Sequence, residues 1–307
     1  MRTLPGLFLP MKFSKPPFTE EQHIKILQDR GLIIQDLERL KYYLKNIGYY
    51  RLTGYMYPFQ QNDGSHKFKK DTTFELILNH YEFDKKLKFL LIDMIERVEI
   101  SIRAYLCNSM ALSYGSHWYL NESLFINRHH HSDLIKYISD YYNDCKELFL
   151  KEYKNKYTEP ILPPSWMIME TLTFGKLSSL YENLMDCEEK REVATTLNVV
   201  VPILESWLKS LNFIRNCCAH HSRLWNRKIP IKPTIPVRKE KRFLNTVNEY
   251  TNLRVYGILS CLLHLLNSIN PSSNFKQKLK DLFNEYPMVN IENMGFYGEW
   301  DKEPLWV

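Results

Sequence analysis

Residues 87–105 read LKFLLIDMIERVEISIRAY, and their apolar side chains recur at every third or fourth position. The recurring positions are Leu87, Leu91, Met94, Val98, Ile102 and Tyr105. This period places side chains on one face of an α-helix, so it predicts a long amphipathic helix, which we extend over residues 73–112. Glu99 and Arg103 stand one turn apart on it, and they either pair structurally or line an interior polar site.

The segments on either side show the same helical period. Thr19 and Gln22 form a capping-box pattern, and Asp36 can cap a second helix. The further expected helices cover residues 20–29, 37–47, 166–184, 243–269 and about 274–284, with one more that starts near Pro202. The helix over 166–184 is expected to be interrupted at Phe174-Gly175. Because only 10 of the 307 residues are glycine, a fold with many turns is disfavoured. We therefore predict an all-α fold.

Three shorter stretches connect these helices. Residues 48–59, GYYRLTGYMYPF, predict a tight aromatic corner. Residues 60–70 combine an Asn-Asp-Gly turn signal with lysines, which predicts a small basic loop or hairpin insertion. Residues 129–131 are three adjacent histidines, and side chains at adjacent positions cannot converge on one metal ion. An exposed turn is expected there.

The composition favours a cytoplasmic, soluble protein. The chain is 44% apolar, and its six cysteines show no CxxC spacing, which is typical of reduced thiols. The N-terminal LPGLFLP is too short for a signal peptide, and no run reaches the ~18 apolar residues of a membrane helix. The net charge of +6 permits a nucleic-acid partner.

The chemistry concentrates in residues 213–226, FIRNCCAHHSRLWN. Cleavage of RNA without metal needs a base, an acid and a cation that holds the phosphate charge. His220 can serve as acid or base, Arg215 can hold phosphate oxygens, and Asn216 can orient either by hydrogen bonding. Asn216 and His220 lie one turn apart, whereas Arg215 lies about 140° around a straight helix from His220. The arginine's length, a helix end or a second chain could close that gap.

Other roles for these residues compete with catalysis. Arg215 and His220 could cap or bridge helices. Cys217 and His221 supply only two zinc ligands on one face, so no metal site is expected. Cys218 projects toward the apolar face of the helix, which disfavours a cysteine nucleophile. We expect no cofactor.

The strongest basic cluster follows directly. Residues 227–242, RKIPIKPTIPVRKEKR, hold seven basic residues against one acidic residue. Three prolines exclude a regular helix there. The candidate RNA-binding residues are Arg227, Lys228, Lys232, Arg238, Lys239, Lys241 and Arg242.

Four stretches resemble the Abi-like abortive-infection proteins of the AbiD/AbiF type. These are KYYLKNIGYYRLTGYMYPF, FDKKLKFLLIDMIERVEISIRAYL, PSWMIMETLTFGKLSSLYENL and RNCCAHHSRLWN. The resemblance implies a HEPN-type helical bundle with an N-terminal helical extension. It suggests three regions: an N-terminal helical region (1–72), a HEPN-like domain (73–270), and a C-terminal helix and tail (271–307).

The resemblance also implies site residues and partners. Arg215 and His220 become a catalytic R-x4-H pair with Asn216 between them, and His221, Arg223, Trp225 and Asn226 become possible supporting residues. Related HEPN nucleases with two motifs per chain contrast with the single motif here, because Asn108 stands where a second histidine would be needed. A homodimer is therefore implied. A small noncoding RNA that would bind the basic segment is a further implied partner.

Two functions follow as expectations. The first is a metal-independent endoribonuclease of a phage-defence system, whose products carry 2′,3′-cyclic phosphates. The second is a non-catalytic RNA-binding protein of a defence or toxin–antitoxin system.

Overall fold

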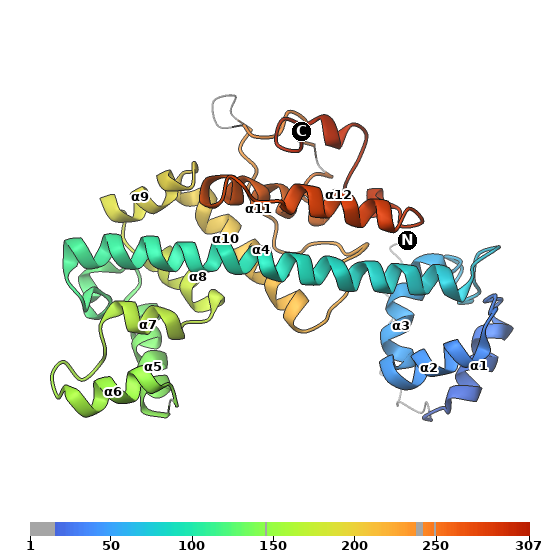
Figure 1. The fold of residues 1–307 in the computed structure, drawn as a ribbon, viewed down its shortest axis with the longest axis horizontal. Coiled ribbons are helices and arrows are strands. Elements are labelled where there is room, and N and C mark those ends of the chain that lie inside the picture. The colour runs from blue at the N-terminus through green and yellow to red at the C-terminus, as the bar shows by residue number, and fades with distance from the viewer. Residues whose placement is uncertain (1–15, 145, 238–241, 249) are drawn as a thin grey trace, which may run out of the picture. The chain divides into compact units, whose positions relative to one another are not determined.

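The computed structural model describes residues 16–144, 146–237, 242–248 and 250–307 (Figure 1). Within these ranges the chain is helical and forms no strand, only three isolated β-bridges. The all-α prediction is therefore confirmed. The α-helices are α1 (Glu20–Asp29), α2 (Leu37–Ile47), α3 (Tyr49–Met56), α4 (Phe74–Tyr114), α5 (Arg128–Asp144), α6 (Leu148–Lys156), α7 (Ser165–Thr171), α8 (Phe174–Asn183), α9 (Glu188–Thr196), α10 (Val201–Ala219), α11 (Val255–Ile269) and α12 (Phe275–Glu285).

The chain divides into two compact units, Met1–Tyr81 and Glu82–Val307. In the first unit, the Thr19 hydroxyl accepts a hydrogen bond from Gln22 N, and the Gln22 side chain accepts from Thr19 N. This is the expected capping box at α1. The predicted basic insertion is closed by an antiparallel bridge between Gln60 and Phe68.

The aromatic stretch after α2 was wrongly predicted to be a corner. It forms helix α3, which continues into a short 3-10 turn at Tyr57–Phe59. Gly48, with φ +89°, lets the chain change direction before α3 starts. Leu52, Tyr55 and Met56 then bury one face of this helix, and that burial favours a helix over a corner.

Helix α4 is the expected long helix. Its apolar positions are buried from Leu87 to Ile102, as the period predicts. Arg103 is also buried; it pairs with Glu99 and donates to the carbonyls of Met169 and Leu172. Because these carbonyls belong to the end of α7 and the residue after it, Arg103 holds α7 against α4. Its role is therefore structural and interior.

Helix α12 runs antiparallel to α4 within the second unit (Figure 1). Lys278 lies 4.0 Å from Asp93, and Glu285, one end of α12, pairs with Lys86. Two aromatic rings of the C-terminal tail, Phe296 and Trp300, pack against Phe283 of α12, with ring centroids 5.1 and 5.8 Å away. Trp306 is fully buried, and its indole nitrogen donates to Ser260 Oγ in α11.

Two further helix predictions differ from the structure in their boundaries. The interruption predicted within 166–184 is present, but it lies at Leu172–Thr173 rather than at Phe174-Gly175, because the Thr173 side chain caps α8. Helix α11 begins only at Val255, not near residue 243. A turn in which Asn248 and Thr251 bond to each other precedes it, and a Cβ on Gly257 would lie 2.4 Å from Asn252 Oδ1. The glycine thus lets the turn lie close against α11.

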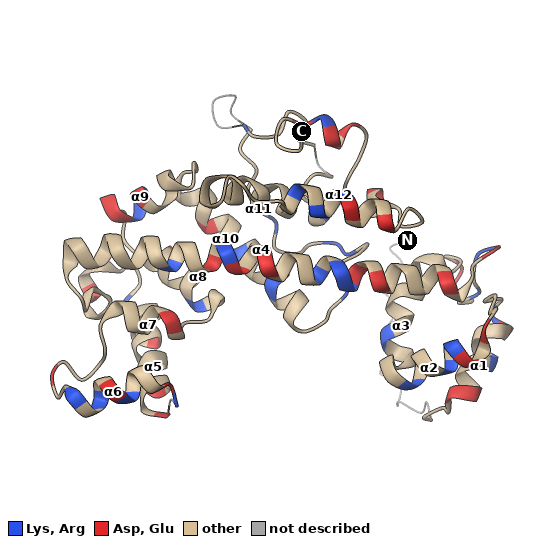
Figure 2. Ribbon diagram, viewed as in Figure 1, with Lys and Arg blue, Asp and Glu red and all other residues tan. Residues whose placement is uncertain are grey.

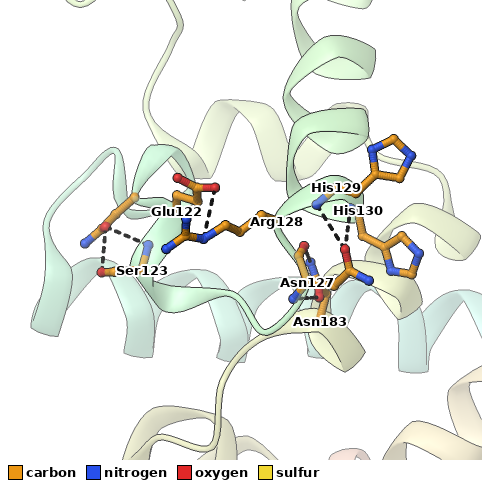
Figure 3. Close-up of polar contacts among 8 residues, drawn as sticks. Glu122, Ser123, Asn127, Arg128, His129, His130 and Asn183 are labelled. Atoms are coloured by element: carbon orange, nitrogen blue, oxygen red, sulfur yellow. Dashed lines mark hydrogen bonds and ion pairs between the residues drawn. The ribbon is translucent and has the colours of Figure 1, made fainter.

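The three adjacent histidines form the first turn of α5 rather than an exposed turn (Figure 3). Asn127 caps this helix, since its Oδ1 accepts from the backbone nitrogens of His129 and His130. Asn183 makes two hydrogen bonds to the Asn127 backbone and thereby fixes the cap. His131 turns inward and contacts the Tyr119 carbonyl at 2.9 Å.

Candidate functional site

Helix α10 carries the motif on its last two turns. Its apolar face is buried as predicted, at Leu204, Trp207, Leu208, Leu211 and Ile214. Asn212, Asn216 and His220 follow one another at intervals of four on a different face. Asn212 is packed against α8, where a Cβ on Gly175 would lie 3.2 Å from its Nδ2. Asn216 and His220 lie farther along the helix.

The helix ends at the motif in a Schellman arrangement. His221 N donates to Cys218 O at 3.0 Å, and Ser222 N donates to Cys217 O at 2.8 Å. The last helical residue is Ala219, and His220 is the C-cap residue, whose backbone N donates to Asn216 O. His221 takes the left-handed position, with φ 55°, where glycine is the usual residue. The chain therefore reverses direction directly after His220.

The three proposed catalytic side chains lie at the surface of this helix end. Arg215 and Asn216 are half-buried, and His220 is exposed. Among the residues that the structure describes, no hydrogen bond or ion pair occupies these three side chains. These side chains can therefore contact a ligand. If they bridged helices, their polar groups would already be occupied by hydrogen bonds.

A carboxylate of α4 holds the turn that follows. Asp84 Oδ1 accepts from Leu224 N at 3.0 Å and from Trp225 N at 2.6 Å. Lys88 Nζ lies 3.0 Å from Asp84 Oδ2, and both side chains are buried. Sequence reasoning missed Asp84. Its spacing from Lys88 is that of an ordinary surface ion pair, and nothing local indicates a partner 140 positions away.

Two of the possible supporting residues have structural roles. Trp225 is buried, and its indole nitrogen lies 3.4 Å from Asn290 O. Asn226 adopts φ 53°, and its Oδ1 accepts from Arg254 Nη1 at 2.9 Å. The other two, His221 and Arg223, are exposed and half-buried respectively. The segment after His220 is therefore held in a fixed conformation from both sides.

The cysteines of the motif are buried. Burial raises the pKa of Cys217, although the charges of Arg227 and Lys88 partly oppose the effect. Burial also raises the pKa of Cys218 to about 12, which keeps this thiol protonated at neutral pH. Among the described residues, no group of three or more His, Cys, Asp or Glu side chains is arranged to hold a metal ion.

The first part of the basic segment is an extended strap along α10, which we define as residues 227–237. Thr234 N donates to Ser206 Oγ at 2.8 Å, and Trp207 Nε1 donates to Thr234 O at 2.8 Å. Asn252 Nδ2 donates to Pro233 O at 2.7 Å from the other side. These bonds hold the strap in place, and along it buried residues alternate with exposed ones.

The candidate RNA-binding residues divide accordingly. Lys228, Lys232 and Arg242 are exposed. The Arg227 guanidinium lies over the Phe213 ring at 5.4 Å and donates to Arg223 O, so it packs beside the motif. Arg238, Lys239 and Lys241 lie outside the described residues. Figure 2 shows that basic and acidic residues are interspersed on most helices.

None of the helices in the described part of the chain is both long and apolar enough to cross a membrane. Comparison with curated proteins and with solved structures finds no match. A family model for Abi-like proteins matches residues 42–226, a range that runs from α2 to the end of the motif. This range is more than half of the chain, and the chain therefore belongs to the Abi-like protein family.

Proposed function

We propose that this protein is a metal-independent endoribonuclease of the HEPN type that acts in abortive infection, a form of phage defence. The observation that supports it most is the helix end. Arg215, Asn216 and His220 reach the surface without occupied side chains in the described structure, on a backbone that neighbouring elements hold. Membership of the Abi-like family supports the biological role.

Each side chain has a chemical task in this proposal. The Arg215 guanidinium binds the scissile phosphate and stabilises the charge that develops on it. His220 removes the 2′-hydroxyl proton or protonates the leaving 5′-oxygen. Asn216 orients the phosphate or the imidazole. Attack of the 2′-oxygen on phosphorus, with loss of the 5′-oxygen, leaves a 2′,3′-cyclic phosphate and a 5′-hydroxyl.

The R-x4-H pair supplies a single histidine, His220, whereas the reaction uses both an acid and a base. Two chains that meet at their motifs would supply two histidines and two arginines related by a twofold axis. We therefore propose a homodimer as the working unit. Sedimentation equilibrium should give a mass of twice 36.8 kDa, and a monomer with full activity would exclude the composite site.

The decisive experiment is RNA cleavage in excess chelator. Arg215→Ala and His220→Ala should each lower the rate by about 10²-fold or more, because each removes a group that acts in the transition state. Arg97→Ala and His129→Ala are matched controls, since both replace exposed residues elsewhere in the same unit and should leave the rate unchanged. Cleavage that persists in the motif variants, or that requires a divalent metal, would exclude this proposal.

A non-catalytic RNA-binding role is the second candidate. It is favoured by one observation, the exposed Lys228 and Lys232 on a strap that is fixed along α10. In that case the wild-type protein would bind RNA tightly without turnover, and His220→Ala would leave both binding and any toxicity to cells unchanged.

A further inference from the structure

The contact between Asp84 and the turn after His220 has features that a surface ion pair lacks. The Asp84 side chain is fully buried, and Lys88 is 7% exposed. A buried carboxylate is costly unless charge and hydrogen bonds compensate it. Here the ammonium of Lys88 and the two backbone N–H groups of Leu224 and Trp225 provide that compensation.

The geometry of these bonds selects one backbone conformation. Two consecutive N–H groups, at residues 224 and 225, point to the same carboxylate oxygen. An extended chain would direct consecutive N–H groups to opposite sides, so this convergence requires a turn. Left-handed residues, His221 and Asn226, stand on either side of that turn. The carboxylate thus stabilises a conformation that the chain would not adopt by local preference.

The chain runs directly from His220 into this turn, so the position of the turn affects the position of His220. Leu224 is four residues from His220, and both Leu224 and Trp225 are buried. We infer that Asp84 is a positioning residue for the proposed ribonuclease site, with Lys88 as its counterion. Because it is buried, Asp84 does not contact substrate; it acts by fixing where the helix end and its histidine lie. This inference rests on the proposed function.

Three variants test it. Asp84→Ala removes the oxygen that accepts from Leu224 N and Trp225 N, and it leaves Lys88 buried without its carboxylate. Lys88→Met removes the cation, and the double variant D84A/K88M removes both charges together with the acceptor. The matched control is D93A/R97M, because Asp93 and Arg97 form a pair with the same spacing on the same helix but are exposed.

The double variant separates positioning from folding. We expect it to unfold at a higher denaturant concentration than D84A, since no buried charge is left alone. Its kcat for RNA should nevertheless fall by about 10²-fold, with KM changed less than about threefold, because misplacement of a catalytic group by 1 Å can cost that much. Deuterium exchange in peptides that cover residues 219–228 should be at least about tenfold faster, while peptides from residues 204–214 keep their protection.

Each outcome decides the inference. Wild-type kcat in the double variant would overturn the positioning role, and so would unchanged exchange over residues 219–228. Faster exchange throughout the unit would show that the pair serves stability in general and would also overturn it. If the wild-type protein cleaves no RNA, the ribonuclease proposal fails together with the catalytic part of this inference. The exchange measurement would then still decide whether Asp84 holds the turn.

Discussion

Arg254 Nη1 donates a hydrogen bond to Asn226 Oδ1 at 2.9 Å, and this bond joins the end of the motif to the start of α11. The two residues are 28 positions apart, with the whole strap between them. Asn226 is one of the residues that tolerate a left-handed backbone, and it uses its side chain here as an acceptor. The pair therefore closes the strap into a loop at its base.

We expect the Asn226–Arg254 bond to contribute about 1 to 2 kcal/mol to the free energy of unfolding, because its donor is charged and half-buried. A double-mutant cycle with Asn226→Ala, Arg254→Ala and the double variant isolates it. Any backbone strain that alanine introduces at position 226 occurs in both arms of the cycle and cancels. Urea unfolding measures the coupling, and a coupling near zero would show that the two side chains act independently.

The left-handed backbone of His221 predicts an order of stability between two variants. His221→Gly and His221→Ala remove the same imidazole, so they differ only by the Cβ atom. That Cβ costs about 1 kcal/mol in a left-handed conformation, and the glycine variant should be the more stable by about this amount. Equal stabilities by urea unfolding would indicate that the turn relaxes once the imidazole is removed.

The exposed lysines of the strap predict a change in the salt dependence of RNA binding. If Lys228 and Lys232 each contact a phosphate, the variant K228A/K232A should reduce the slope of log K against log salt by about 1.4 for single strands. Lys302→Ala is the control, since Lys302 is exposed but pairs with Glu299 in the C-terminal tail. A slope that stays the same in K228A/K232A would remove the strap from the binding surface.

Stability should fall with acid because of His264. Burial among Trp207 and Phe243 lowers the pKa of its imidazole, while a hydrogen bond to Asn198 O partly opposes this effect. Below the ordinary histidine pKa of about 6.5 the unfolded chain binds the proton more readily, so stability falls as pH decreases toward the folded-state pKa.

Replacing the imidazole should remove that part of the acid sensitivity. We expect His264→Phe to flatten the decline in unfolding free energy below about pH 6.5, where one histidine contributes at most about 1.4 kcal/mol per pH unit. Leu279→Ala is the control, because it removes buried apolar volume in α12 without a titrating group and should lower stability equally at each pH. His80 and His23, whose pKa values burial also lowers, would maintain the rest of the decline.

Local signals in the sequence predicted local structure well. The capping box at Thr19, the cap at Asp36 and the long helix around residues 87–105 depend on side chains within about one turn of each other. The same period identified the buried face of α10 and placed Cys218 on it. Predictions were wrong where a distant contact prevails over the local pattern. Residues 243–254 lie outside α11, and Glu303 of the C-terminal tail accepts hydrogen bonds there from Asn245 N and Thr246 N.

The sequence by itself determined that the chain is helical, where Arg215, Asn216 and His220 stand along one helix, and which side of that helix is buried. These properties follow from the spacing of residues along the chain, which the sequence gives directly. Only the tertiary structure decided that Asp84 holds the turn beyond His220 and that the strap is fixed to Ser206 and Trp207. Those contacts join residues separated by up to 141 positions, and their energies depend on burial that no local pattern records.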